Sequence, residues 1–156
     1  MRVAIGLGAN LGDRIATLRE AASRVARLAP VIARSKLWET APVGGPQQPD
    51  YLNAAMLIEW DREPIELLDA LLAIEAELGR VREVANGPRT IDLDLLWIDG
   101  LEINDARLVV PHPRLHLRAF ALAPMLEVVP DAVDPRTGAH YVVPADPGVR
   151  ALGQPL

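Results

Sequence analysis

Four stretches of the chain alternate apolar residues with small or polar ones, which is the pattern of half-buried β-strands. We expect strands over residues 3–8, 31–40, 51–60 and 91–98. The even-numbered apolar residues of 51–60 share one face, which leaves Asn53 on the other. In 3–8, large residues alternate with small ones, which indicates that something closely approaches one face of this strand.

Two segments between these strands have apolar residues at helical spacing. The first is expected over 15–29, with Asp13 at its N-terminus and Pro30 after its end. The second begins at Pro64 and ends before Gly79, because proline suits the first turn of a helix and glycine suits the residue after its end. The order strand, helix, strand, strand, helix, strand predicts a ferredoxin-like α+β fold with a βαββαβ core.

The part of the chain after residue 98 is expected to add to this core. Asp99 and Gly100 indicate a hairpin turn, from which residues 101–103 return as a short strand. Residues 118–129 are expected to form a helix, and the tail from Pro130 a loop with one short strand near 141–143. The fold class hosts many functions and therefore does not by itself indicate any chemistry.

The fourth strand carries the strongest candidate chemistry. Its apolar face is predicted to hold Ile91, Leu93, Leu95 and Trp97. Asp92 and Asp94 then point the other way, with Cα atoms about 6.5 Å apart. Paired carboxylates on a half-buried strand are costly without a cation, and Mg²⁺ prefers such oxygen ligands. The alternative is the solvated face of an edge strand, but the apolar run at 95–98 predicts a central one.

Three polar segments are candidates for binding substrate. Arg80, Arg82 and Arg89 lie just before the carboxylate pair and would suit phosphates, although they could also form a solvated turn. The loop 41–50, with three prolines, is either a binding loop or a surface insertion. The glycine-rich turn after the first strand could cradle a phosphate or simply pack the first helix on the sheet.

Composition and charge narrow the class of protein. The 156 residues, half of them apolar, predict one folded domain over 1–156. A net charge of −5 argues against general binding of nucleic acid. The sequence shows neither a long apolar span nor a signal-peptide pattern, so we expect no membrane partner. The lack of cysteine excludes disulfides and agrees with a cytoplasmic location.

Five short motifs occur in a set order, and together they carry a resemblance. They are GLGANLGDR at 6–14, PDYLNAA at 49–55, GRVR at 79–82, GPRTIDLD at 87–94 and VPHP at 110–113. In this order and at this spacing the chain resembles the 6-hydroxymethyl-7,8-dihydropterin pyrophosphokinase family over about residues 3–130. The resemblance implies an enzyme of folate biosynthesis, with ATP and hydroxymethyl-dihydropterin as its substrates. We also expect the protein to be a monomer.

The resemblance also implies roles for individual residues. Two Mg²⁺ would be held by Asp92 and Asp94, while Arg80 and Arg89 would steady the transferring group. Residues that resemble nucleotide and phosphate contacts are Glu75, Arg82, Arg107, His112 and Arg118. The pterin ring would lie against Tyr51 and Phe120, and its edge would be bound by Thr40, Val43 and Asn53. Segments 41–50 and 80–89 match the family's mobile catalytic loops.

Two other functions stay open from the sequence. A phosphohydrolase could use the same carboxylate pair and would release phosphate from ATP without a pterin. A non-catalytic ferredoxin-like module could bind RNA, although the acidic charge and the lack of a basic aromatic sheet face count against it.

Overall fold

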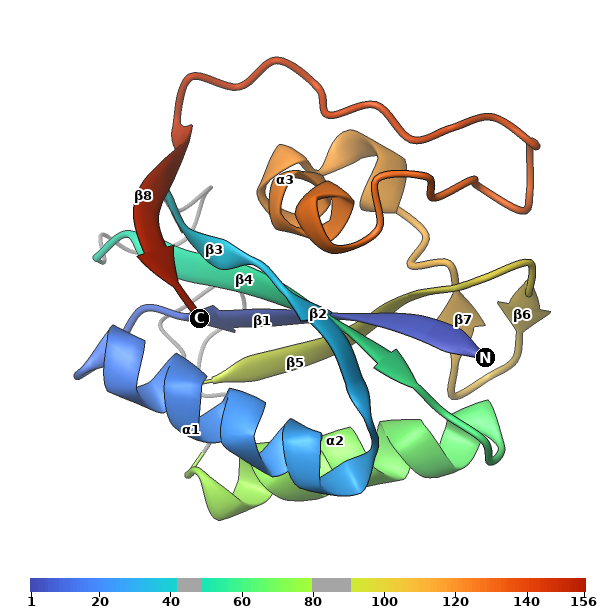
Figure 1. Ribbon diagram of the computed structural model, residues 1–156, viewed down its shortest axis with the longest axis horizontal. Helices are drawn as coiled ribbons and strands as arrows, with labels where there is room; N and C mark the ends of the chain where they lie inside the picture. Colours follow the sequence, from blue (N-terminus) through green and yellow to red (C-terminus); the bar gives the residue numbers. More distant parts are fainter. Residues whose placement is uncertain (42–48, 80–90) are drawn as a thin grey trace.

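The computed structural model describes residues 1–41, 49–79 and 91–156, and it has a sheet with helices on both faces (Figure 1). All strand pairs are antiparallel, and the order in the main sheet is β5-β1-β4-β3-β8, with β2 also paired to β4. The elements are β1 (Arg2–Ala9), α1 (Arg14–Leu28), β2 (Val31–Arg34), β3 (Lys36–Thr40), β4 (Tyr51–Glu59), α2 (Pro64–Glu77), β5 (Asp92–Ile98), β6 (Ile103–Asn104), β7 (Val109–Val110), a 3₁₀ turn (Leu115–Leu117), α3 (Ala119–Val128) and β8 (Val149–Pro155).

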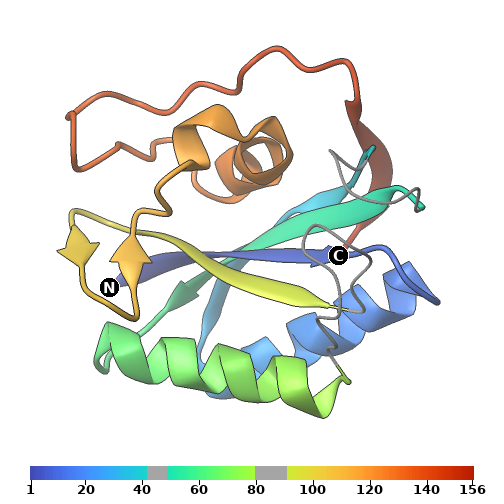
Figure 2. The same ribbon diagram turned by 180° about the vertical axis from the view of Figure 1, so that it is seen from behind.

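Helices α1 and α2 cover one face of the sheet, and α3 covers the other (Figures 1 and 2). The larger core joins α1 and α2 to the inward residues of the strands, such as Ile5 and Met56. A second core joins α3 to residues of the opposite face, such as Leu57 and Trp97. The ferredoxin-like α+β fold is thereby confirmed, with the second layer supplied by the C-terminal part of the chain.

Both predicted core helices begin where their capping residues require. The Asp13 carboxylate accepts a hydrogen bond from the Ala16 amide at 3.1 Å, which satisfies one of the free amides of α1. At the start of α2, Glu63 and Glu66 form a capping box around Pro64. In the described part of the chain, helices stay too short or too polar to cross a membrane.

The stretch predicted as one strand over 31–40 is two strands, β2 and β3, separated by Ser35. Arg34 lies opposite Met56 and Trp38 opposite Asn53. An advance of four residues from β2 into β3 therefore pairs with an advance of only three residues along β4. The buried Ser35 hydroxyl accepts a hydrogen bond from the Ala55 amide at 2.8 Å and donates one to the Lys36 carbonyl at 2.7 Å. These bonds replace the regular ladder at the irregularity.

Strand β5 differs from the sequence prediction in two ways. It lies at the edge of the sheet, paired only with β1 among the described residues, and the prediction of a central strand is wrong. The second face of β5 is also apolar because it packs against α3 and the segment just before it, which includes Leu115. Leu95 pairs with Ile5 and Trp97 with Ala4, which leaves Leu96 as an extra residue. This bulge turns Trp97 toward α3, whereas alternation had placed it with Leu93 and Leu95.

The C-terminal part also departs from expectation. Ile98 and Leu101 form a single bridge, and the short strand at 103–104 pairs with 109–110 and not with β5. The predicted strand near 141–143 is absent from the described structure, and the strand of the tail is β8 at its end. Since Gly153 and Pro155 weaken its strand pattern, β8 depends on pairing with β3.

Candidate active site

A cavity of about 520 Å³ opens between the sheet and α3. Residues of β1, β3, β4 and β5 form its floor, and residues 114–121 form the opposite wall. Its lining brings together seven of the residues singled out in the sequence, namely Thr40, Tyr51, Asn53, Asp92, Asp94, Arg118 and Phe120. Segments far apart in the chain therefore meet in one place.

The two carboxylates share the cavity face of β5, as strand alternation predicted. Asp92 lies opposite Gly8 and Asp94 opposite Gly6 in the neighbouring strand β1. All four residues line the cavity, and the glycines keep the floor beside the carboxylates free of side chains. A larger side chain at Gly6 would contact Leu96, and one at Gly8 would contact Asn53, which explains why this face of β1 carries glycines.

The close approach of the two carboxylates affects the protonation of Asp94. Burial raises the pKa of Asp94 to about 7, and the charge and hydrogen bond of Asp92 and the charge of Glu75 add to the effect. Arg118 acts in the opposite direction. A divalent cation between Asp92 and Asp94 would remove the repulsion that favours the protonated form.

The donor set fits Mg²⁺. In the described residues no group of three or more His, Cys, Asp or Glu side chains is placed to hold a metal. Asp92 and Asp94 therefore offer two carboxylates and no complete cage. Mg²⁺ commonly binds one or two carboxylates, keeps several waters and takes its other ligands from substrate phosphates. Zinc, which prefers nitrogen and sulfur ligands in a closed site, fits less well.

Glu75, predicted as a nucleotide contact, lies near the end of α2 and is 3 % exposed. Its Oε2 accepts a hydrogen bond from the Leu93 amide at 2.7 Å. Leu93 stands between Asp92 and Asp94, so this bond holds the segment of β5 that carries both carboxylates. This position resembles that of the groups that orient ligands in metal sites through hydrogen bonds.

Three further residues were predicted as nucleotide contacts in the described part of the chain. Arg118 lines the cavity. The pKa of His112 is lowered, first by burial and then by the charges of Arg118 and Arg114. Its Nδ1 accepts a hydrogen bond from the Arg114 amide at 3.2 Å, so a neutral ring would carry its proton on Nε2. Arg107 lies outside the cavity lining and forms an exposed ion pair with Asp69.

The cavity lining also combines aromatic rings with buried polar groups. Tyr51 comes from β4 and Phe120 from α3, and the Arg118 guanidinium lies 5.6 Å from the Phe120 ring centre. The Asn53 side-chain amide donates to the Thr40 hydroxyl at 3.2 Å, and both residues are buried. This bond leaves the Asn53 carbonyl and its second amide hydrogen to bind another group. Such a combination suits a flat, polar heterocycle.

The cavity also includes residues that the sequence analysis missed. Arg114, Leu117 and Leu96 line it beside the predicted ones. Arg114 lies before the helix expected over 118–129, next to the 3₁₀ turn, where no periodic pattern of the sequence indicates which way its side chain points. Four predicted residues, Val43, Arg80, Arg82 and Arg89, lie outside the described residues, as do most of the two predicted loops.

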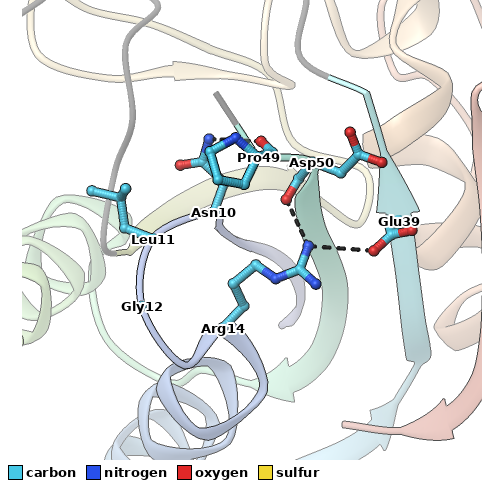
Figure 3. Close-up of a pocket in the computed structure, with 7 residues that line it drawn as sticks. All are labelled: Asn10, Leu11, Gly12, Arg14, Glu39, Pro49 and Asp50. Atoms are coloured by element: carbon cyan, nitrogen blue, oxygen red, sulfur yellow. Dashed lines mark hydrogen bonds and ion pairs between the residues drawn. The ribbon is translucent and has the colours of Figure 1, made fainter. Parts of the chain in front are cut away.

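The glycine-rich turn after β1 borders a separate hollow of about 400 Å³ (Figure 3). The Asn10 side chain donates to the Pro49 carbonyl at 3.1 Å, and Arg14 donates to the Asp50 carbonyl at 2.8 Å. Asp13 already caps the first turn of α1. The bonds of Asn10 and Arg14 join the turn to residues 49 and 50, and its two alternative roles, a phosphate cradle or packing of the first helix on the sheet, stay predictions.

Comparison with known proteins gives a consistent result. A family model described as 7,8-dihydro-6-hydroxymethylpterin-pyrophosphokinase (HPPK) matches residues 4–130. The chain is 42% identical over 139 residues to a 2-amino-4-hydroxy-6-hydroxymethyldihydropteridine pyrophosphokinase of Synechocystis sp., covering 88% of this chain and 71% of that protein. It is 45% identical over 134 residues to the protein of the same name from Methylorubrum extorquens, covering 85% of each.

Solved structures agree on the fold. The crystal structure of Plasmodium falciparum HPPK-DHPS, wild type with pterin and p-hydroxybenzoate, superposes with a TM-score of 0.67 at 14% identity. The match covers 90% of this chain and 41% of that chain, so the present protein spans about two fifths of the length of that relative.

Proposed function

Because the chain belongs to the 7,8-dihydro-6-hydroxymethylpterin-pyrophosphokinase family, we propose that it transfers a pyrophosphoryl group from ATP to 6-hydroxymethyl-7,8-dihydropterin for folate biosynthesis. The resemblance in the sequence motifs and the expectation of an enzyme of the pyrophosphokinase class are both confirmed. In the proposed reaction the hydroxymethyl oxygen attacks the β-phosphorus of ATP. The bond from that phosphorus to the oxygen bridging toward the α-phosphate breaks, AMP leaves, and the alcohol proton passes to solvent.

The observation that carries this proposal is the meeting of two kinds of groups in one cavity. The carboxylates of Asp92 and Asp94 come from β5, and a second set of groups, Tyr51, Asn53 and Phe120, comes from β4 and α3. A site for ATP alone would not require the second set. A cavity of this size can hold a pterin beside a triphosphate, which brings the alcohol and the β-phosphorus together.

On the phosphate side, Asp92 and Asp94 would hold Mg²⁺, as two ions by family resemblance. When bound, the metal supplies charge neutralisation for the phosphates. Glu75 orients the carboxylates through the Leu93 amide. Arg118 faces the same cavity and suits a phosphate oxygen. His112, held neutral, can donate a hydrogen bond from Nε2.

On the pterin side, Tyr51 and Phe120 would stack on the ring, and Asn53 with Thr40 would bind its polar edge. The hydrogen bond between Asn53 and Thr40 fixes the orientation of the amide before a ligand arrives. Preorganised groups of this kind lower the entropic cost of binding. Roles for Val43 at the edge, for Arg82 and Arg107 with the nucleotide, and for Arg80 and Arg89 with the transferring group stay predictions, as do the monomeric state and cytoplasmic location.

The other two functions receive less support. Ferredoxin-like modules that bind RNA stack bases on an exposed sheet face. Here the helices cover both faces of the sheet (Figures 1 and 2). A phosphohydrolase would explain the carboxylates but not the aromatic and amide groups in the same cavity.

The proposal is tested by measuring AMP formation from ATP and Mg²⁺ with and without 6-hydroxymethyl-7,8-dihydropterin. We expect AMP only when the pterin is present. Asp92→Ala and Asp94→Ala should each lower turnover by roughly a thousandfold, since charge stabilisation by a metal accounts for several kcal/mol of the barrier. Asp61→Ala, an exposed residue away from the cavity, is the control. Pterin-independent release of phosphate would instead establish a phosphohydrolase.

A further inference from the structure

Strand β8 lies beyond the part of the chain that the family model matches, which ends at residue 130. It joins the sheet beside β3 (Figure 1), with Arg150 opposite Glu39 and Val149 opposite Thr40. Thr40 is both the last residue of β3 and part of the cavity lining. The C-terminal strand therefore supports, from outside, one strand of the cavity floor.

Four charged residues form a cluster at this point. The Glu39 carboxylate binds Arg14 at 3.3 Å through one oxygen and Arg150 through the other. Arg150 also lies 3.4 Å from the Asp50 carboxylate, and Arg14 donates to the Asp50 backbone carbonyl at 2.8 Å (Figure 3). The Glu39 side chain is 17% exposed and that of Arg14 29%, whereas Arg150 is 54% exposed and closes the cluster from the solvent side.

The cluster holds two points of the backbone that precede cavity residues. Glu39 comes directly before Thr40, and Asp50 directly before Tyr51. Thr40 and Tyr51 are paired across β3 and β4, and Thr40 receives the hydrogen bond of Asn53. A change in the distance between Glu39 and Asp50 would therefore move the groups proposed to bind the pterin. Asp92, Asp94 and Arg118 lie on β5 and beside α3, outside this connection.

We propose that Arg150 is a positioning residue for the dihydropterin, because it joins Glu39 to Asp50 and so sets the placement of Thr40 and Tyr51. The inference rests on the proposed function, since it concerns the pterin end of the same cavity. Arg150 acts through its neighbours, as it is not part of the cavity lining. Its loss should weaken binding of the pterin and leave binding of ATP nearly unchanged.

The test compares Arg150→Ala and Arg150→Lys with Arg19→Ala in the full-length protein. Arg19 donates to the Pro155 carbonyl at 3.0 Å, so the control removes an anchor of the same strand away from the cluster. Arg150→Ala should raise the KM for the dihydropterin about fivefold and change the KM for ATP less than about twofold. Arg150→Lys should recover part of the loss, because it keeps the positive charge and both contacts of Arg150 come from one nitrogen, Nη2. Arg19→Ala should leave both KM values within about twofold.

A second readout does not depend on activity. Amide hydrogen exchange of residues 50–56, measured without ligand, should become faster in Arg150→Ala and stay unchanged in Arg19→Ala. An unchanged pterin KM in Arg150→Ala, or an equal rise in the KM for both substrates, would overturn the inference. If the wild-type protein forms no pterin-dependent AMP, the proposed function fails. In that case the exchange of residues 50–56 alone decides whether Arg150 holds this part of the cavity floor in place.

Discussion

At the scale of single residues, the site depends on groups whose state is set by their neighbours. Asp94 is the clearest case, because burial and then the charges of Asp92 and Glu75 raise its pKa, whereas Arg118 lowers it. The isolated side chain would be ionised at neutral pH, whereas in the metal-free fold it is balanced between its two forms. The same repulsion that opposes ionisation is what a divalent cation would relieve.

This balance predicts how stability varies with pH without metal. Because the folded-state pKa of Asp94 is raised to about 7, the native state binds more protons than the unfolded state between the usual aspartate pKa and 7. The free energy of unfolding in EDTA should therefore fall as pH rises through that window. Asp94→Asn should lose this part of the dependence, as urea unfolding at pH 5 and pH 8 would reveal. Identical pH profiles for the two proteins would contradict the assignment.

Gly8 offers a second prediction at this scale. A Cβ atom at this position would lie 3.2 Å from Oδ1 of Asn53, closer than ordinary contact. Since that amide is held by Thr40, Gly8→Ala should displace the proposed pterin contact. We expect the KM for the pterin to rise about three- to tenfold, equivalent to a lost hydrogen bond, with a smaller change for ATP. Equal changes for both substrates would indicate a general distortion of the floor.

At the scale of elements, the alternation of apolar residues predicts which face a side chain occupies where two strands pair regularly, but not where the pairing contains a bulge. The two faces of β4 follow the alternation of its sequence because its pairing with β1 has no bulge. The turn of Trp97 toward α3 depends on the extra residue in β5, and a bulge is a property of the pair of strands. The split at Ser35 has the same origin.

The residues of the candidate site also differ in whether a local sequence pattern could predict them. The carboxylate pair could be predicted because Asp92 and Asp94 are two residues apart in one strand. Arg114 was missed because its place in the lining depends on how residues 114–121 pack over the sheet. Tyr51 and Phe120 were expected from resemblance to a family, since no local pattern joins residues so far apart in sequence.

Ser35 provides the prediction for this scale. Its hydroxyl bonds the Ala55 amide and the Lys36 carbonyl at a buried irregularity between β2 and β3. Ser35→Ala should lower the free energy of unfolding by about 1–3 kcal/mol, because a buried amide loses its partner. Urea unfolding measures this loss. Ser23→Ala, a partly buried position in α1, is the control and should cost less. An equal or smaller loss in Ser35→Ala would show that water or backbone movement replaces the bonds.

At the scale of the whole molecule, the cavity draws on β1, β3, β4, β5 and the segment beside α3. A ligand that contacts all of these elements binds only the folded chain and therefore raises its stability. The proposed reaction breaks the bond on the α side of the β-phosphorus. An ATP analogue with a methylene group between the α- and β-phosphorus should therefore bind without reacting.

We expect Mg²⁺ with this analogue, at a hundredfold excess over its dissociation constant, to add about 2.7 kcal/mol to stability. For a domain of this size the melting temperature should rise by roughly 5–10 °C. Asp92→Ala should respond far less to the same mixture, and the analogue with EDTA serves as the second control. A full response from Asp92→Ala would place the metal elsewhere.

The covering of the sheet by α3 has a consequence for the protein during its synthesis. The strands that carry Asn53, Asp92 and Asp94 leave the ribosome before the segment that supplies Arg118 and Phe120. Until that segment follows, the face with Leu57 and Trp97 is open to water. A chaperone that recognises exposed apolar strands would therefore bind the nascent chain at the sheet face that later lines the cavity.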